Sequence, residues 1–106
     1  MKQQSMNLNV KCDLSDEIWE TIISAIYESM EGWIGFGKND QNDGIPYWFG
    51  IDETQKHIWA SIEPSGLLFA GLMKDDEWEQ WKLAIKKIAT QKLGFKVGET
   101  ELGEVD

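Results

Sequence analysis

The sequence predicts an α+β protein of two layers, in which two helices lie on one face of an antiparallel, four- to five-stranded meander sheet. Two segments with the hydrophobic period of a helix, residues 15–31 and about 76–93, stand on either side of a run of short alternating segments. The connections within that run are short and rich in turn residues, which favours antiparallel neighbours. A chain of 106 residues supports one hydrophobic core, so we expect 1–106 to form a single domain.

The two ends of the chain are polar. Residues 1–12 show weak alternation at Leu8 and Val10, which predicts either an arm or an edge strand. Residues 99–106 carry four acids and no base, and we expect this tail to be loose.

The first helix has clear signals at both ends. Ser15 suits the N-cap, and two acids, Asp16 and Glu17, follow it at the positive end of the helix dipole. Gly32 suits the stop. The apolar residues recur with helical period at Ile18, Ile22, Ile26 and Met30.

Four short strands are expected next, at 33–37, 47–51, 57–63 and 67–72. The polar loop 38–45 contains Asp43-Gly44, and Pro64-Ser65-Gly66 marks a tight turn. The second helix then begins at about Asp76, which has capping-box spacing to Glu79, and ends at Gly94. Its predicted buried stripe consists of Trp78, Trp81, Ile85 and Ile88.

Alternation along the strands separates two sets of side chains. The apolar set, expected to meet the helices, is Ile34, Phe36, Tyr47, Phe49, Ile51, Ile58, Ala60 and Ile62. The other set carries Trp33, Trp48 and Trp59, together with His57 and several glycines. We therefore expect an aromatic platform on the exposed face that binds a partner. The alternatives are that the rings lie over the glycines, that the arm or tail covers them, or that a homodimer buries them.

The charge of the chain limits its partners. The formal net charge is -9, and all ten bases are lysines. The absence of arginine and the acidity argue against nucleic-acid binding and favour a basic protein as partner. Between residues 12 and 37 there are six acids and no base. Of these, Asp13, Glu17, Glu20, Glu28 and Glu31 are expected to project into solvent, either as a solubilising face or as a field that attracts a cationic partner.

The sequence offers little for catalysis. His57 is the only histidine and has no nucleophile motif near it, and Cys12 is the only cysteine, so neither a catalytic triad nor a zinc site is indicated. Residues 39–44 resemble the start of a calcium loop, but the position of the bidentate acid falls on Gly50. We expect no enzyme activity, no metal and no cofactor. No stretch approaches the ~20 apolar residues of a membrane span, and no leader is visible, which indicates a cytoplasmic protein.

The profile of the whole chain resembles that of small bacterial immunity proteins, which neutralise a cognate toxin domain. The features that carry the resemblance are the acidity, the aromatic-rich strands GWIGFG (32–37), YWFGI (47–51) and HIWASI (57–62), and the ending LGFKVGE (93–99). The resemblance implies a non-catalytic inhibitor of a basic toxin domain, such as a nuclease. It concerns the chain as a type and implies no individual binding residues. The alternatives are a module that binds a small molecule or a peptide through the tryptophans, and a structural homodimer.

Overall fold

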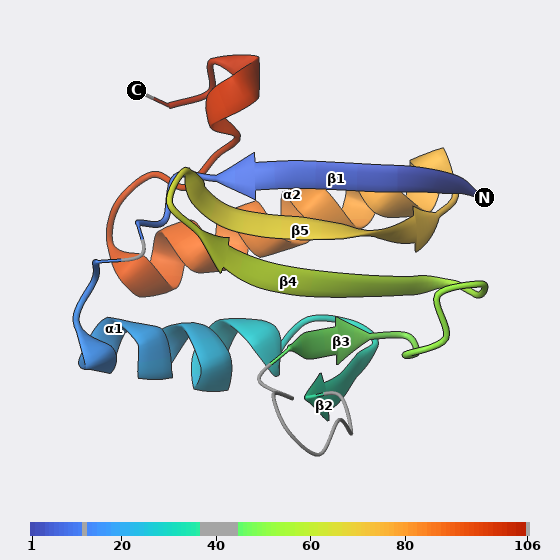
Figure 1. The fold of residues 1–106 in the computed structure, drawn as a ribbon. Helices are drawn as coiled ribbons and strands as arrows, with labels where there is room; N and C mark the ends of the chain where they lie inside the picture. The colour runs from blue at the N-terminus through green and yellow to red at the C-terminus, as the bar shows by residue number, and fades with distance from the viewer. Residues whose placement is uncertain (12, 37–44, 106) are drawn as a thin grey trace.

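A computed structural model describes residues 1–11, 13–36 and 45–105 and has the predicted α+β architecture (Figure 1). A five-stranded antiparallel sheet is packed against two helical segments. In chain order the elements are β1 (Lys2–Leu8), α1 (Asp16–Thr21), the π-helix η1 (Ile22–Tyr27), β2 (Trp33–Phe36), β3 (Pro46–Trp48), β4 (His57–Glu63), β5 (Gly66–Met73), α2 (Asp75–Leu93) and the 3₁₀ turn η2 (Thr100–Leu102). No helix in these ranges is both long and apolar enough to cross a membrane.

The strands are arranged in the order β1-β5-β4-β3-β2, and every neighbouring pair is antiparallel. Strands β2 to β5 form the expected meander. β1 is an edge strand that pairs with β5 along its whole length, from Lys2 opposite Met73 to Leu8 opposite Leu67. Figure 1 shows β1 lying beside β5, at the far side of the sheet from β2. The N-terminal segment was predicted to be either an arm or an edge strand, and in the structure it is an edge strand.

The first helix begins as its sequence predicts and then widens. The Ser15 hydroxyl accepts a hydrogen bond from the Ile18 N–H at 3.4 Å, so Ser15 is the N-cap. From Ile22 the hydrogen bonds change to the π pattern, as in the bond from the Glu28 N–H to the Ile23 carbonyl. The wider turn brings the neighbouring residues Ile26 and Tyr27 into the core together. The hydrophobic period gave no sign of this π segment.

The second helix begins one residue earlier than predicted, and the capping box is wrong. Its N-cap is Lys74, which makes no side-chain capping bond. Asp75 instead accepts a hydrogen bond from Gln4 at 2.8 Å and pairs with Lys2, so a contact with β1 accompanies the start of the helix. The hydrogen bonds from Gln4 and Lys2 lower the pKa of Asp75. The helix ends at Gly94, as expected, in the left-handed conformation at φ 82°.

The core lies between one face of the sheet and the helices. Among its fully buried side chains are Leu8, Trp48, Ile58, Phe69 and Ile85. α2 crosses behind the sheet in Figure 1, and the ring of Trp81 from α2 lies 5.2 Å from that of Trp48 and 5.6 Å from that of Phe69. Trp78 and Trp81 are both buried, which confirms that they are packing residues. The face turned toward the viewer in Figure 1 carries no helix, and we call it the open face.

The expectation of a loose acidic tail is wrong for the residues that the structure describes. Glu99 is only 5% exposed and receives the ammonium groups of Lys82 at 2.9 Å and Lys86 at 2.7 Å. Glu104 accepts a bond from Lys86 at 3.0 Å and one from the Glu99 N–H at 2.9 Å. Acids that look unpaired in the sequence are therefore paired with lysines 13 or more residues earlier in the chain, a tertiary contact that no local pattern reveals.

Candidate functional site

The predicted aromatic platform does not exist as one surface, because Trp48 points into the core. Its side chain has 0% exposure, and its indole N–H donates to the Tyr27 carbonyl at 3.1 Å. The ring lies 5.0 Å from Tyr27, edge to face, and 5.9 Å from Phe69. Trp48 is thus the centre of an aromatic cluster that joins η1, α2 and the sheet, and it has no surface left for a partner.

Trp33 is also on the helix side. It pairs with Trp48 across β2 and β3, its ring lies 5.2 Å from that of Trp48, and the side chain packs partly buried against the core. Only Trp59 lies on the open face, half-buried, with Tyr47 as its cross-strand neighbour. The prediction that three indoles share the exposed face is therefore wrong for Trp33 and Trp48.

The error comes from the phase of the strands. Trp48 pairs with Ile58, and Tyr47 pairs with Trp59, so β3 is displaced by one residue from the register that apolar alternation suggested. A one-residue shift moves every side chain to the other face. Between Trp33 and Gly35 the pairing of β2 with β3 also shifts, which marks a bulge. Several residues predicted to meet the helices are also largely exposed, namely Ile34, Phe36, Ile51 and Ile62. Ile62 keeps the predicted phase of Ile58 and Ala60 but lies next to the end of β4.

His57 was predicted to be an accessible partner-binding residue, and this placement is wrong. It is 3% exposed, and its Nδ1 lies 2.8 Å from the Gln55 carbonyl oxygen. Since a carbonyl only accepts, Nδ1 is the donor of this bond. His57 therefore supports the turn that leads into β4. Cys12, Gly37 and the loop 38–44 lie outside the described residues.

The acidic residues lie where the sequence placed them. Asp13, Glu17, Glu20, Glu28 and Glu31 are all exposed, as is Asp16 in the first turn of α1. No described lysine forms an ion pair with any of these six carboxylates. The surface around α1 and η1 consequently carries negative charge that the described fold does not neutralise.

An apolar groove lies beside this acidic helix. We call it the α1 groove; it has a volume of ≈ 160 Å³. It lies between α1, η1 and strands β2 to β4, and its lining residues are Trp19, Ile23, Tyr27, Phe36, Ile45, Pro46, Ala60, Ser61 and Ile62. Three of these apolar side chains have a large exposed fraction: Phe36 at 43%, Ile45 at 41% and Ile62 at 52%.

The charged and apolar parts are adjacent along the helix. Glu20 follows Trp19 directly and precedes Ile23 by three residues, and Asp16 precedes Trp19 by three. Residues three or four apart share one side of a helix, so both acids flank the groove. Sequence reasoning missed the groove because it assigned Phe36 and Ile62 to the core. One signal in the sequence could have revealed the α1 groove: the strand ends carry more apolar residues than two helices can cover.

Burial accounts for the most perturbed titratable group near the groove. Tyr27 is 4% exposed, and removal from water raises the pKa of its phenol because the charged form is disfavoured. In the described ranges, no three His, Cys, Asp or Glu side chains are grouped so that they could hold a metal ion. The groove therefore offers apolar contact flanked by carboxylates, an arrangement suited to binding a cationic, partly apolar surface.

Comparison of the chain with protein-family models, with curated proteins and with solved structures gave no match.

Proposed function

We propose that this chain is a non-catalytic binding protein of the immunity type, which neutralises a basic toxin domain in the bacterial cytoplasm. The observation that carries the proposal is the adjacency of exposed carboxylates on α1, without ion-pair partners among the described lysines, to the exposed apolar lining of the α1 groove. The resemblance to immunity proteins, with the net charge of -9, supplies the class of partner.

The carboxylates account for recognition of a basic partner. Six acids within one helical segment and its flanks produce a local negative potential, which raises the association rate of a cationic protein. Because these acids are exposed, they contribute more to the encounter than to the final affinity, and salt screens them.

The groove accounts for the affinity of the docked state. Phe36, Ile45 and Ile62 leave apolar surface in water that a partner would cover, at roughly 25 cal/mol for each Å² buried. Exposed apolar side chains inside a polar rim are typical of an interface centre. In this proposal the groove replaces the aromatic platform as the source of the anchoring contacts.

The test uses the protein encoded by the reading frame next to that of this chain, which the proposal expects to be basic. We expect co-expression of the chain to restore growth of cells that express this protein, and the two purified proteins to form a complex. In Glu17→Gln/Glu20→Gln/Glu28→Gln we expect the association rate constant, measured by stopped flow at low salt, to fall about tenfold or more.

The matched control is Glu53→Gln/Asp76→Asn/Glu101→Gln, which removes three exposed acids elsewhere on the surface. An equal loss of rate in this control would show that net charge alone matters and would remove the role of α1. A Phe36→Ser/Ile62→Ser variant separates the groove from the charges, because it should speed dissociation and leave the salt dependence of association unchanged. Lack of both rescue and binding would contradict the immunity function itself.

A homodimer is the second candidate, and the open face favours it. Trp59, Tyr47, Leu68 and Leu72 lie on that face, half-buried, with no helix over them. Analytical ultracentrifugation distinguishes the two: concentration-dependent dimers that Trp59→Ser abolishes would favour self-association, and a monomer at millimolar concentration would exclude it.

A further inference from the structure

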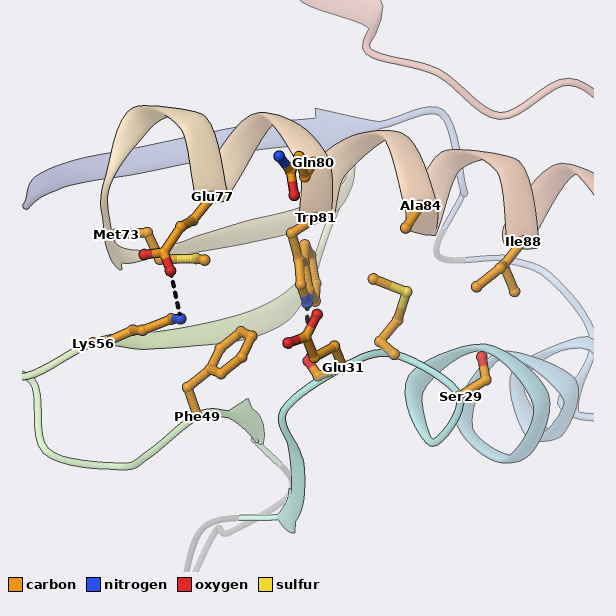
Figure 2. A pocket seen from close by; sticks show the side chains of 11 residues that line it. Ser29, Glu31, Phe49, Lys56, Met73, Glu77, Gln80, Trp81, Ala84 and Ile88 are labelled. Atoms are coloured by element: carbon orange, nitrogen blue, oxygen red, sulfur yellow. Dashed lines mark hydrogen bonds and ion pairs between the residues drawn. The ribbon is translucent and has the colours of Figure 1, made fainter.

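A second cleft shares no lining residue with the α1 groove, and we call it the α2 cleft (Figure 2). Its volume is ≈ 320 Å³, room for about ten water molecules. Its walls are the turn after η1, one side of α2, and the segment that joins β3 to β4. The residues that line it are Ser29, Met30, Glu31, Phe49, Lys56, Met73, Glu77, Gln80, Trp81, Ala84 and Ile88.

The cleft already holds one cationic group. The Lys56 ammonium lies 3.1 Å from a carboxylate oxygen of Glu77 and 4.3 Å from the centre of the Phe49 ring. Figure 2 shows the ammonium between that carboxylate and that ring. A cation within about 6 Å of an aromatic face is attracted by the ring quadrupole. Carboxylate and ring together form a seat for an ammonium group.

The seat is formed by backbone geometry that is unusual for an aromatic residue. Phe49 has φ 71°, a left-handed conformation that is uncommon outside glycine, and its N–H donates to the Gly32 carbonyl at 2.7 Å. Its ring lies directly over Gly32, where a Cβ atom would come within 2.5 Å of the ring carbons. The glycine thus provides the space in which the ring takes its position beside Lys56.

The cleft has more negative charge than Lys56 neutralises. Its lining includes two carboxylates, of Glu31 and Glu77, against the one ammonium of Lys56. No described lysine pairs with the Glu31 carboxylate. The backbone of Glu31 is held in place by the indole N–H of Trp81, which donates to its carbonyl at 3.2 Å. One carboxylate therefore remains free beside unfilled, partly apolar space.

We infer that the α2 cleft is a binding site for a primary alkylammonium group, and that Lys56 is an occupant which the fold itself supplies. The apolar lining of Met30 and Met73 takes the alkyl stem, and the carboxylates with the Phe49 ring take the charged head. A lysine side chain of a protein and a free small amine share this chemistry. The inference does not depend on the proposed function, because the cleft is separate from the α1 groove and shares only Glu31 with the acidic surface.

The experiment measures binding of two probes, n-butylammonium and Nα-acetyl-lysine N-methylamide, by NMR. The reporter is the indole N–H signal of Trp81, which lies in the wall of the cleft, and the Trp59 indole on the open face is the internal control. n-Butanol tests the stem without the charge, and sodium chloride at equal ionic strength tests the charge without the stem. Lys56→Met should bind n-butylammonium about fivefold more tightly than the unchanged chain, since the resident cation is removed.

Two further variants locate the seat. In the Lys56→Met background, Glu77→Gln and Glu31→Gln should each weaken binding several-fold, whereas Glu53→Gln, outside the cleft, should leave it unchanged. Thermal unfolding of each variant verifies that it is folded. Equal binding of both probes supports a lysine side chain as the natural occupant, and preference for n-butylammonium supports a free amine. No shift of the Trp81 signal in Lys56→Met, or an equal shift with n-butanol, would overturn the inference.

Discussion

Trp48 and Trp59 lie on adjacent strands of the same sheet and have opposite environments. Trp48 is on the face covered by α2 and η1, has no exposed surface, and is surrounded by the rings of Tyr27, Phe69 and Trp81. Trp59 is on the open face and half-buried. Since the residue type is the same, the difference shows that the pairing of β3 with β4 decides whether an indole forms the core or the surface.

The largest expected effect is that of removing the covered ring. Trp48→Ala should lower the free energy of unfolding by about 3–5 kcal/mol, because it leaves a cavity and deletes the bond to the Tyr27 carbonyl. Trp59→Ala should cost at most about 1 kcal/mol. Urea unfolding followed by circular dichroism measures both. Similar losses in the two variants would contradict the distinction between the faces.

The second expected effect compares the buried carboxylate of Glu99 with the buried ring of Trp48 in their contributions to the free energy of unfolding. Glu99→Gln should lower the free energy of unfolding by about 3 kcal/mol, because it removes the buried carboxylate that the largely buried ammonium groups of Lys82 and Lys86 share. Lys82 then keeps only Glu79, at 3.7 Å, and Lys86 keeps only Glu104. The matched control is Glu101→Gln, two residues away and exposed, expected to change stability by less than about 0.5 kcal/mol. If Glu99→Gln lowers the free energy of unfolding no more than Glu101→Gln does, the ion pairs of Glu99 with Lys82 and Lys86 do not stabilise the fold.

The smallest expected effect is on the pH dependence of stability, and it arises from the ion pair of Glu104 with Lys86. The hydrogen bond from the Glu99 N–H, and after it that from the Lys86 ammonium, lowers the pKa of Glu104 from its ordinary value. Burial alone would lower the pKa of Lys86, but its bonds to Glu99 and Glu104 raise it overall. The contribution of Glu104 to stability is therefore complete above its ordinary pKa and is lost as the pH falls through the lowered value.

Glu104→Gln should accordingly flatten the acid limb of the stability curve below the ordinary pKa of a glutamate, with little change in slope near neutral pH. Unfolding free energies measured across that range, with Glu53→Gln as the control for removal of one carboxylate, provide the comparison. An unchanged acid limb in Glu104→Gln would show that Lys86 does not hold this carboxylate in solution.

Much of the local structure was predictable. The cap at Ser15, the stop at Gly94 and the exposure of the helix acids depend on interactions within a few residues, and the structure contains all three. The α+β architecture followed from two helical periods around a run of short alternating segments. For the candidate site, the exposure of its carboxylates was predicted correctly, and their role in binding stays a prediction. The apolar residues beside them were assigned to the core, although Phe36 and Ile62 remain exposed.

What the sequence by itself determined is the set of elements and the sign of the surface charge, because hydrophobic period, capping and composition act locally. Only the tertiary structure decided which faces the tryptophans occupy, where Glu99 and Glu104 find their lysines, and which apolar residues remain exposed. The physical reason is that strand register and ion pairing are settled between segments far apart in the chain. A single-residue displacement of β3, and the bulge in β2, moved the indoles of Trp48 and Trp33 from the expected surface to the helix side of the sheet.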